Sequence, residues 1–225
     1  MIGTGNENAK GKCFGMKTIG MPAGMWLLFA GSFRKQLSET LGYDAIRARE
    51  ITSKAKREYK RIIQGLPEFE KGDRFRMNIV SCAMLGAFLL KMPVKPTVDQ
   101  AADYYREAMS TVAMKAFCRM AANRKFTRKD IEGMKATAAM NAADRNPYSW
   151  NMTFHPYPDG SGYEARFTKC GICTLTKELG LFEYVPAMCR LDYTMSELGG
   201  ASEFVRKYTL ASGGPYCDCG YRRKR

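Results

Sequence analysis

Apolar residues recur at helical spacing along much of the chain before residue 147. One basic segment carries a narrow apolar stripe, which is typical of a surface helix, and the next is apolar nearly all round, which indicates a buried central helix. Thr97 with Gln100 three residues later forms a capping box, so a long helix is expected to begin there. The predicted helices are 43–64, 78–92, 97–122 and 131–142.

The pattern changes after Pro147, where alternation of apolar and polar residues replaces the helical period. Two alternating runs flank Pro158, Asp159 and Gly160, which favours a β-hairpin, and glycines at 180 and 199–200 end two short helical runs. The predicted strands are 148–154, 163–168 and 204–210, with a continuation after 213–215, and the predicted helices are 175–179 and 186–198.

These patterns together predict an α+β fold. Residues 1–146 would form a helical part, and residues 147–225 would form a smaller part with an antiparallel sheet flanked by helices. A chain of 225 residues with 45% hydrophobic content is long enough to bury a substantial core. We therefore expect the two parts to pack as one compact unit, with the candidate site in the second.

Charge separates the two parts. Residues 1–146 carry 26 Lys and Arg against 14 Asp and Glu, whereas residues 147–225 carry 10 against 8, so most of the formal charge of +14 lies on the helical part. Such a charge suggests nucleic-acid binding. However, the basic residues of 43–64 are spread around the helix, as on a solvated face, and no Lys or Arg is interleaved with a zinc-ribbon pattern. Nucleic acid is therefore a disfavoured partner.

The N-terminal region gives no indication of a membrane segment. Its densest apolar stretch, residues 21–33, is too short to span a bilayer and contains Pro22, Gly24 and Gly31. Polar residues and three lysines occupy the first twenty positions, which does not resemble a secretory signal. We expect a cytoplasmic protein, whose cysteines would be buried thiols, metal ligands or reactive groups.

Five of the eight cysteines lie in the last third of the chain. Cys170 and Cys173 form a C-x-x-C, the spacing of a metal knuckle or a redox pair, and they could ligate a divalent metal or an iron-sulfur cluster if two further ligands converged. No second C-x-x-C and no suitably placed histidine completes such a site. Several of the cysteines could equally be small buried residues.

Two further motifs place a thiol beside a carboxylate. On a helix over 186–198, Cys189 and Asp192 share one face. Cys217 and Asp218 are adjacent, so in a regular strand they would point to opposite faces unless the glycines at 213–214 introduce an irregularity. Both aspartates could instead be structural, Asp192 as a partner of Arg190 or Arg206 and Asp218 in a turn.

These motifs resemble the signature of the L-2-amino-thiazoline-4-carboxylic acid hydrolase family. The resemblance rests on Cys189-x-x-Asp192-Tyr193, Thr209-Leu210-Ala211-x-Gly213-Gly214 and Cys217-Asp218, and it is strongest over residues 169–221. A weaker similarity at 64–67 indicates that most of the chain belongs. Cys219 stands where an aromatic residue is expected, so we interpret it as a packing position.

The resemblance implies a hydrolase that opens a cyclic isothiourea bearing a carboxylate to an N-carbamoyl cysteine. Such chemistry needs an activated nucleophile, N–H donors for the tetrahedral centre and a cation for the carboxylate. On this basis Cys189, Asp192, Cys217 and Asp218 are candidate catalytic residues. The candidate substrate-binding residues are Arg206, Thr209, Gly213 and Gly214.

A second hypothesis comes from another functional class. The same cysteines could belong to a non-catalytic module that binds a small ligand, zinc or an iron-sulfur cluster. His155 is the only histidine, which excludes multi-histidine metal sites, and its position between Phe154 and Pro156 favours a turn-side residue over a catalytic base.

Overall fold

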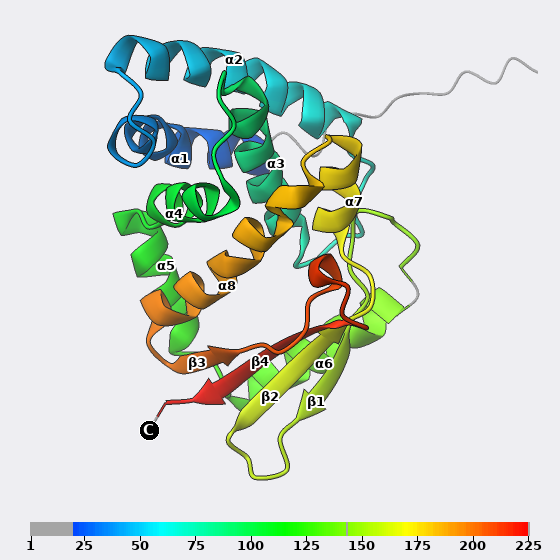
Figure 1. Cartoon of the computed structure of the whole chain (residues 1–225). Coiled ribbons are helices and arrows are strands. Elements are labelled where there is room, and N and C mark those ends of the chain that lie inside the picture. The colour runs from blue at the N-terminus through cyan, green and yellow to red at the C-terminus, as the bar shows by residue number, and fades with distance from the viewer. Residues whose placement is uncertain (1–19, 143, 225) are drawn as a thin grey trace, which may run out of the picture.

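A computed structural model describes residues 20–142 and 144–224 and has the predicted α+β fold (Figure 1). Cys13 lies outside the described residues. Six helices precede the sheet, and Asp44 begins the basic one by accepting a hydrogen bond from the Arg47 amide at 2.8 Å. These helices are α1 (Gly20–Glu39), α2 (Ala45–Gly65), α3 (Arg76–Lys91), α4 (Val98–Met109), α5 (Val112–Ala122) and α6 (Arg128–Ala142).

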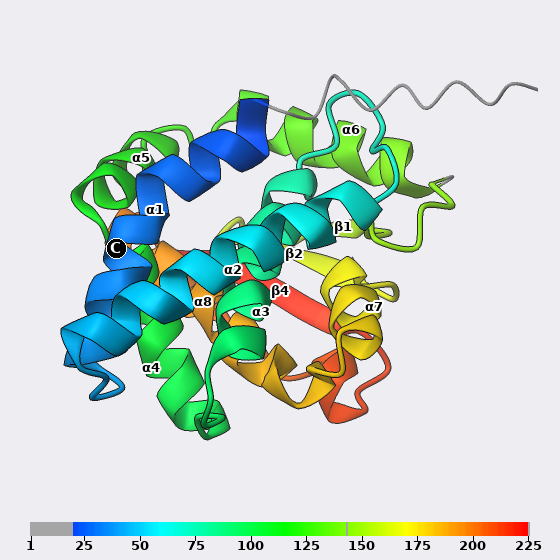
Figure 2. The ribbon, with the colours of Figure 1, turned by 90° about the horizontal axis from the view of Figure 1, so that it is seen from above.

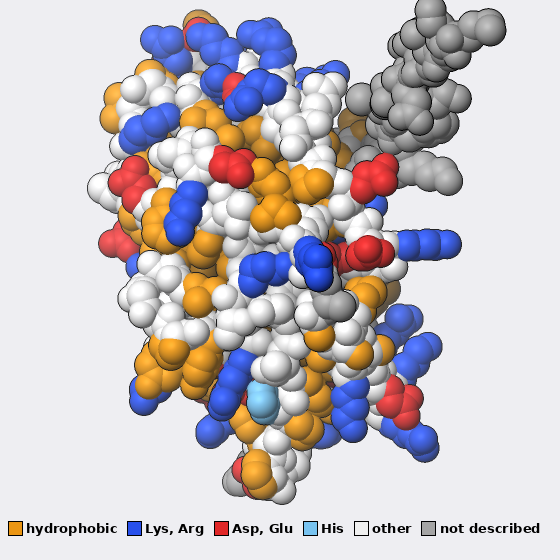
Figure 3. All heavy atoms as spheres, turned by 90° about the vertical axis from the view of Figure 1, so that its right-hand side faces the viewer, with side chains coloured by type: hydrophobic (Ala, Val, Ile, Leu, Met, Phe, Trp, Pro, Cys, Tyr) orange, Lys and Arg blue, Asp and Glu red, His pale blue; other side chains and the backbone are white. Residues whose placement is uncertain are grey.

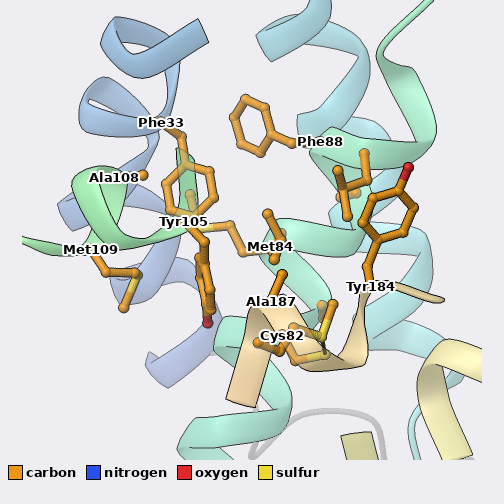
Figure 4. Close-up of a cluster of buried hydrophobic side chains, with 14 of the residues drawn as sticks. Phe33, Cys82, Met84, Phe88, Tyr105, Ala108, Met109, Tyr184 and Ala187 are labelled. Atoms are coloured by element: carbon orange, nitrogen blue, oxygen red, sulfur yellow. Dashed lines mark hydrogen bonds between the residues drawn. The ribbon is translucent and has the colours of Figure 1, made fainter. Parts of the chain in front are cut away.

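Helix α3 is the buried central helix that the all-round apolar pattern predicts. Its residues from Ile79 to Leu89 are all buried, and it packs against α1, α2 and α7. Figure 4 shows Phe33, Met84, Phe88 and Tyr105 converging in the core around it, with the rings of Phe33 and Phe88 5.0 Å apart. The central helix therefore forms the centre of the hydrophobic core.

The prediction of one helix over 97–122 is wrong, because the chain forms two helices there. The capping box of Thr97 and Gln100 is present, but α4 ends at Met109. The Ser110 hydroxyl donates to the Arg106 carbonyl at 2.7 Å, and Thr111 accepts from the Met114 amide at 3.2 Å to begin α5. Side chains of Ser and Thr compete with the helical hydrogen bonds and favour a break at such positions.

The second part of the chain builds one antiparallel sheet in the order β1-β2-β4-β3. The predicted hairpin is present as β1 and β2, and two helices lie between β2 and β3, as expected. The elements are β1 (Thr153–Pro156), β2 (Gly162–Phe167), α7 (Gly171–Glu178), α8 (Val185–Gly199), β3 (Ser202–Val205) and β4 (Cys217–Arg223), with short 3₁₀ turns at Phe182–Tyr184 and Leu210–Ser212.

The strand expected over 204–210 ends early, at Val205. The Asp218 carboxylate accepts hydrogen bonds from the backbone amides of Lys207 at 2.9 Å and Tyr208 at 2.5 Å. These amides are therefore unavailable to a neighbouring strand, and residues 206–216 form a loop. The sheet resumes only at Cys217.

Helix α8 lies between the helical layer and the sheet (Figures 1 and 2). It packs against α4, α5 and β3, so residues from both parts of the chain contribute to one hydrophobic cluster. The division at residue 146 stays a prediction. None of the helices in the described ranges is long and apolar enough to cross a bilayer.

Candidate active site

A cavity of about 480 Å³ lies between one face of the sheet and helices α3, α5, α6 and α8. Strand register determines its floor, because Cys217 pairs with Phe167, Cys219 with Ala165, and Tyr221 with Tyr163. All six of these residues line the cavity. Alternate residues of a strand share a face, so the regular pairing of β2 and β4 turns three residues of each strand toward the same space.

The same alternation separates Cys217 from Asp218. Cys217 lines the cavity, whereas Asp218 pairs with Arg166 on the opposite face of the sheet and is not among the lining residues. Its carboxylate holds the amides of Lys207 and Tyr208 instead. The structure thus brings Cys189, Asp192 and Cys217 to one cavity and leaves Asp218 as an anchor of the loop over 206–216.

Arg206 and Asp192 form an ion pair at the cavity wall. The Arg206 side chain is only 6% exposed, while that of Asp192 is 43% exposed. Arg206 also donates to the Cys189 carbonyl at 3.1 Å and to the Cys219 sulfur at 3.0 Å. Its buried Nε–H has no hydrogen-bond partner among the described residues, so one directional donor remains unused.

Six of the seven described cysteines have raised pKa values, and all seven are free thiols. Burial raises the pKa of Cys189 to about 12 and also raises the pKa of Cys217 and Cys219. These three thiols line the cavity in the protonated form at neutral pH. Cys219, which the sequence suggested as a packing position, is therefore part of the site and a partner of Arg206.

Cys170 is the exception, with a pKa lowered to about 7. The Cys173 thiol donates to its sulfur and makes the largest contribution, which outweighs the opposing effect of burial. The backbone amides of Cys173 and Ile172 and the indole of Trp150 also lower the pKa of Cys170. Hydrogen bonds to the charged form of a group favour that form, so a substantial fraction of Cys170 is thiolate at neutral pH.

Local sequence explains how Cys170 reaches this position. It is the N-cap residue of α7, so it lies beside the free amides of the first helical turn, although its side chain makes no capping hydrogen bond. Gly171 follows at a place where a Cβ atom would overlap the Tyr148 carbonyl oxygen. Only glycine allows the start of α7 to lie this close to the segment that carries Trp150.

Lys125 lies at another wall of the cavity, in the connection between α5 and α6. Its Nζ atom lies 3.3 Å from the ring centroid of Tyr221, and burial lowers its pKa to about 8. Lys125 forms no ion pair within the described part of the chain. Nearby Asp130 accepts a hydrogen bond from the Tyr163 hydroxyl at 2.8 Å. No pattern in the sequence distinguishes Lys125, which is one of many basic residues in its region.

Residues 76–221 match the model of the L-2-amino-thiazoline-4-carboxylic acid hydrolase family. The chain belongs to this family. The matched segment contains every cavity-lining residue from Asn78 to Tyr221, and only Arg74 and Phe75 precede it. No curated protein matches the chain, and no solved structure matches it either.

The Thr-Leu-Ala-x-Gly-Gly motif that resembles this hydrolase family forms the loop before β4. Thr209 and Gly214 line a second hollow of about 480 Å³, which shares Cys189 and Arg206 with the first cavity. The Gly214 amide donates to the Thr209 carbonyl at 2.9 Å, and the Gly213 amide donates to the Leu210 carbonyl at 3.2 Å. Both amides, which the sequence suggested as donors to substrate, are engaged within the loop.

Metal-ligand geometry is absent from residues 20–142 and 144–224, where no three His, Cys, Asp or Glu side chains are grouped to hold an ion. Cys170 and Cys173 contact each other, but no third ligand joins them in this part of the chain. His155 lies on the edge strand β1, where its Nε2 atom is 2.9 Å from the Thr153 hydroxyl, and it does not line the cavity.

Proposed function

We propose that this member of the hydrolase family opens a five-membered cyclic isothiourea that carries a carboxylate, as in L-2-amino-thiazoline-4-carboxylic acid. The net reaction adds one water at the ring carbon between sulfur and nitrogen and breaks the bond from that carbon to sulfur, which gives an N-carbamoyl cysteine. The site must therefore provide a cation, a base, an acid and a nucleophile.

The observation that carries this proposal is Lys125, which forms no ion pair with the residues that the structure describes and lies in the same cavity as the Asp192–Arg206 pair. A partly buried ammonium group that makes no direct ion pair is a suitable partner for the carboxylate of a small anionic substrate. A cavity of about 480 Å³ has the size of a small-molecule site. We assign the substrate carboxylate to Lys125.

Asp192 is proposed as the proton acceptor for water. Its carboxylate is held by Arg206 and is partly exposed, so water can reach it. Arg206 is already engaged by Asp192, Cys189 and Cys219, and it therefore acts by positioning Asp192 and by offering its remaining Nε–H to the substrate. Cys189 and Cys217 are protonated at neutral pH and are proposed as proton donors to the ring sulfur as it leaves.

The test is incubation of the purified chain with L-2-amino-thiazoline-4-carboxylate, with mass-spectrometric detection of N-carbamoyl cysteine. Lys125→Met is the matched variant and is expected to need a much higher substrate concentration. Calorimetry on the same samples distinguishes the hydrolase from the non-catalytic alternative. Saturable binding without product would support a ligand-binding module and contradict the hydrolase. If the protein neither binds the compound nor forms product, the proposed hydrolase function is also contradicted.

A further inference from the structure

We propose that Cys170 is the nucleophile of this site and attacks the ring carbon of the cyclic isothiourea. This inference rests on the proposed function and adds a covalent step to it. It gives the C-x-x-C pair, which the sequence suggested as metal ligands, a catalytic role.

The two cysteines of the pair occupy different positions relative to the cavity. Cys170 lines it, whereas Cys173, one helical turn later on α7, does not. Cys173 therefore stands behind Cys170 and donates its thiol hydrogen to the Cys170 sulfur. We assign Cys173 as a positioning residue that stabilises the thiolate, and Cys170 as the group that touches substrate.

The neighbours of Cys170 favour its thiolate over those of the other cysteines around the cavity. The titratable groups that influence it come from four elements and are all thiols with raised pKa values: Cys82 of α3, Cys173 of α7, Cys189 of α8 and Cys217 of β4. At neutral pH these neighbours are protonated and carry no charge that would oppose a thiolate. Cys170 lines the cavity beside the Cys173 thiol and the Trp150 indole, which lower its pKa, and no other described cysteine has a lowered pKa.

Two independent features of the same cavity indicate an anionic ligand facing this thiolate. Arg206, with its side chain 6% exposed, leaves its Nε–H without a partner among the described residues. Lys125 lies over the Tyr221 ring and forms no ion pair within residues 20–142 and 144–224. A carboxylate-bearing substrate that uses these donors would be held in the cavity onto which Cys170 opens.

The chemical step is balanced without an oxidant or a metal. The Cys170 thiolate forms a bond to the ring carbon, and the electron pair of the carbon–nitrogen double bond moves to nitrogen, which takes a proton. The bond from this carbon to the ring sulfur then breaks, and the sulfur leaves with its electron pair and receives a proton from a neutral thiol such as Cys189. The substrate is now an open isothiourea on Cys170.

Water completes the cycle at the same carbon. Asp192 accepts a proton from water as the water oxygen adds to this carbon, and that proton then returns to Cys189, which gave its own to the ring sulfur. As the bond from carbon to the Cys170 sulfur breaks, the carbonyl forms, the hydroxyl proton passes to the nitrogen, and the Cys170 thiolate is restored. The product is the N-carbamoyl cysteine, one water is consumed, and no electrons are exchanged. Because ring opening releases nothing, the intermediate adds the whole mass of the substrate to Cys170.

The first experiment is acid quenching of the wild-type protein during turnover, followed by peptide mass mapping. We expect an adduct of substrate mass on the peptide that carries Cys170. An adduct on Cys189 or Cys217 would overturn the assignment of the nucleophile. The assignment would also be overturned if the wild-type protein turned over without any adduct and Cys170→Ser kept full activity.

The second experiment compares Cys170→Ser, Cys173→Ala and, as a matched control, Cys82→Ala, a buried thiol outside the cavity lining. Cys170→Ser should lower kcat by on the order of 10³-fold or more. Cys173→Ala, which removes the side-chain donor, should retain part of the activity but move the acidic limb of the pH profile to higher pH, which a merely structural role would not do. Cys82→Ala should stay within a few-fold of wild type.

Alkylation by iodoacetamide supplies a readout that needs no substrate. Cys170 should react fastest of the seven described cysteines near neutral pH, with a midpoint near its pKa of about 7, and Cys173→Ala should raise that midpoint. If wild type does not turn over the cyclic isothiourea, the proposed function fails and the nucleophile assignment fails with it. If wild type is active and Cys170→Ser is equally active, only the nucleophile assignment fails.

Discussion

Helix α2 and the cavity beneath α8 place their charges in opposite ways. On α2 the basic residues are numerous and exposed, and Glu50 pairs with Lys54 at 2.6 Å and with Arg47 at 2.8 Å. Figure 3 shows Lys and Arg side chains gathered at the end of the molecule where α2 lies. In the cavity, Arg206 is nearly buried and Lys125 has lost enough solvation to lower its pKa to about 8.

This contrast shows that the number of charges does not mark the site. Exposed ion pairs are screened by water and typically contribute about 0–1 kcal/mol each. A buried charge must be compensated, so removing its partner costs more. The following predictions test whether the cavity, and not the basic helix, carries the chemistry.

The largest effect is expected for Asp192→Asn. This change removes the proposed base and leaves the nearly buried Arg206 without its ion-pair partner. We expect kcat to fall about 100-fold or more and the free energy of unfolding to fall by roughly 1–3 kcal/mol, below the range for fully buried pairs because Asp192 is 43% exposed. Steady-state kinetics and urea denaturation measure the two quantities.

Asp99→Asn is the matched control, because it breaks the exposed pair with Arg190, which spans 2.6 Å. It should change stability by less than about 1 kcal/mol and leave kcat unchanged. Equal losses in both variants would break the distinction between buried and exposed charges.

The second prediction concerns Lys125 and pH. The Cys170 thiolate forms as pH rises through about 7, and the Lys125 cation is lost as pH rises through about 8, so kcat/KM should be bell-shaped with these two limbs. Lys125→Met should raise KM by about 10- to 100-fold. Lys125→Arg keeps the positive charge and should move the alkaline limb to higher pH. If that limb stays at the same pH, Lys125 is not the group that titrates there.

The same residue gives a check on stability that is independent of substrate. Burial lowers the pKa of Lys125 from 10.5 to about 8, so between these values the unfolded chain holds a proton that the folded chain has released. This group therefore contributes stability that rises with pH across that window. Chemical denaturation of wild type and Lys125→Met at several pH values should show that the rise is reduced in the variant.

A smaller effect is expected for Asp218→Ala. Two backbone amides, those of Lys207 and Tyr208, lose their acceptor, which should lower the free energy of unfolding by about 1–3 kcal/mol. Activity should fall only several-fold, through displacement of the loop that follows Arg206. Asp159→Ala, which removes an exposed turn hydrogen bond to Ser161, serves as the control. If Asp218→Ala lowered kcat as much as Asp192→Asn does, Asp218 would have to be counted among the catalytic residues.

The smallest effect is expected on α2. Replacing Lys54, Lys56, Arg57 and Lys60 together with Gln removes exposed charges that lie far from the cavity lining in sequence. Activity should remain within a few-fold, and an electrophoretic shift with generic DNA or RNA at physiological salt should be absent in wild type. Collapse of activity in a variant with an unchanged circular dichroism spectrum would contradict this comparison.

Local patterns in the sequence determined much of the fold. All-round apolarity predicted the central helix α3, and alternation around a turn predicted the hairpin of β1 and β2. The spacing of Cys189 and Asp192 on one helix predicted that both would face the same cavity. These features were predictable because helical and strand periods fix which neighbouring residues share a face.

Only the tertiary structure decided the chemistry of the individual side chains. Asp192 had two possible arginine partners in the sequence, and the fold pairs it with Arg206 while Arg190 contacts Asp99. Cys170 owes its lowered pKa partly to Trp150, and Lys125 reaches the cavity from a helix connection more than forty residues away from either cysteine of the C-x-x-C. Burial and hydrogen bonding set protonation and reactivity, and both depend on groups that sequence periodicity does not bring together.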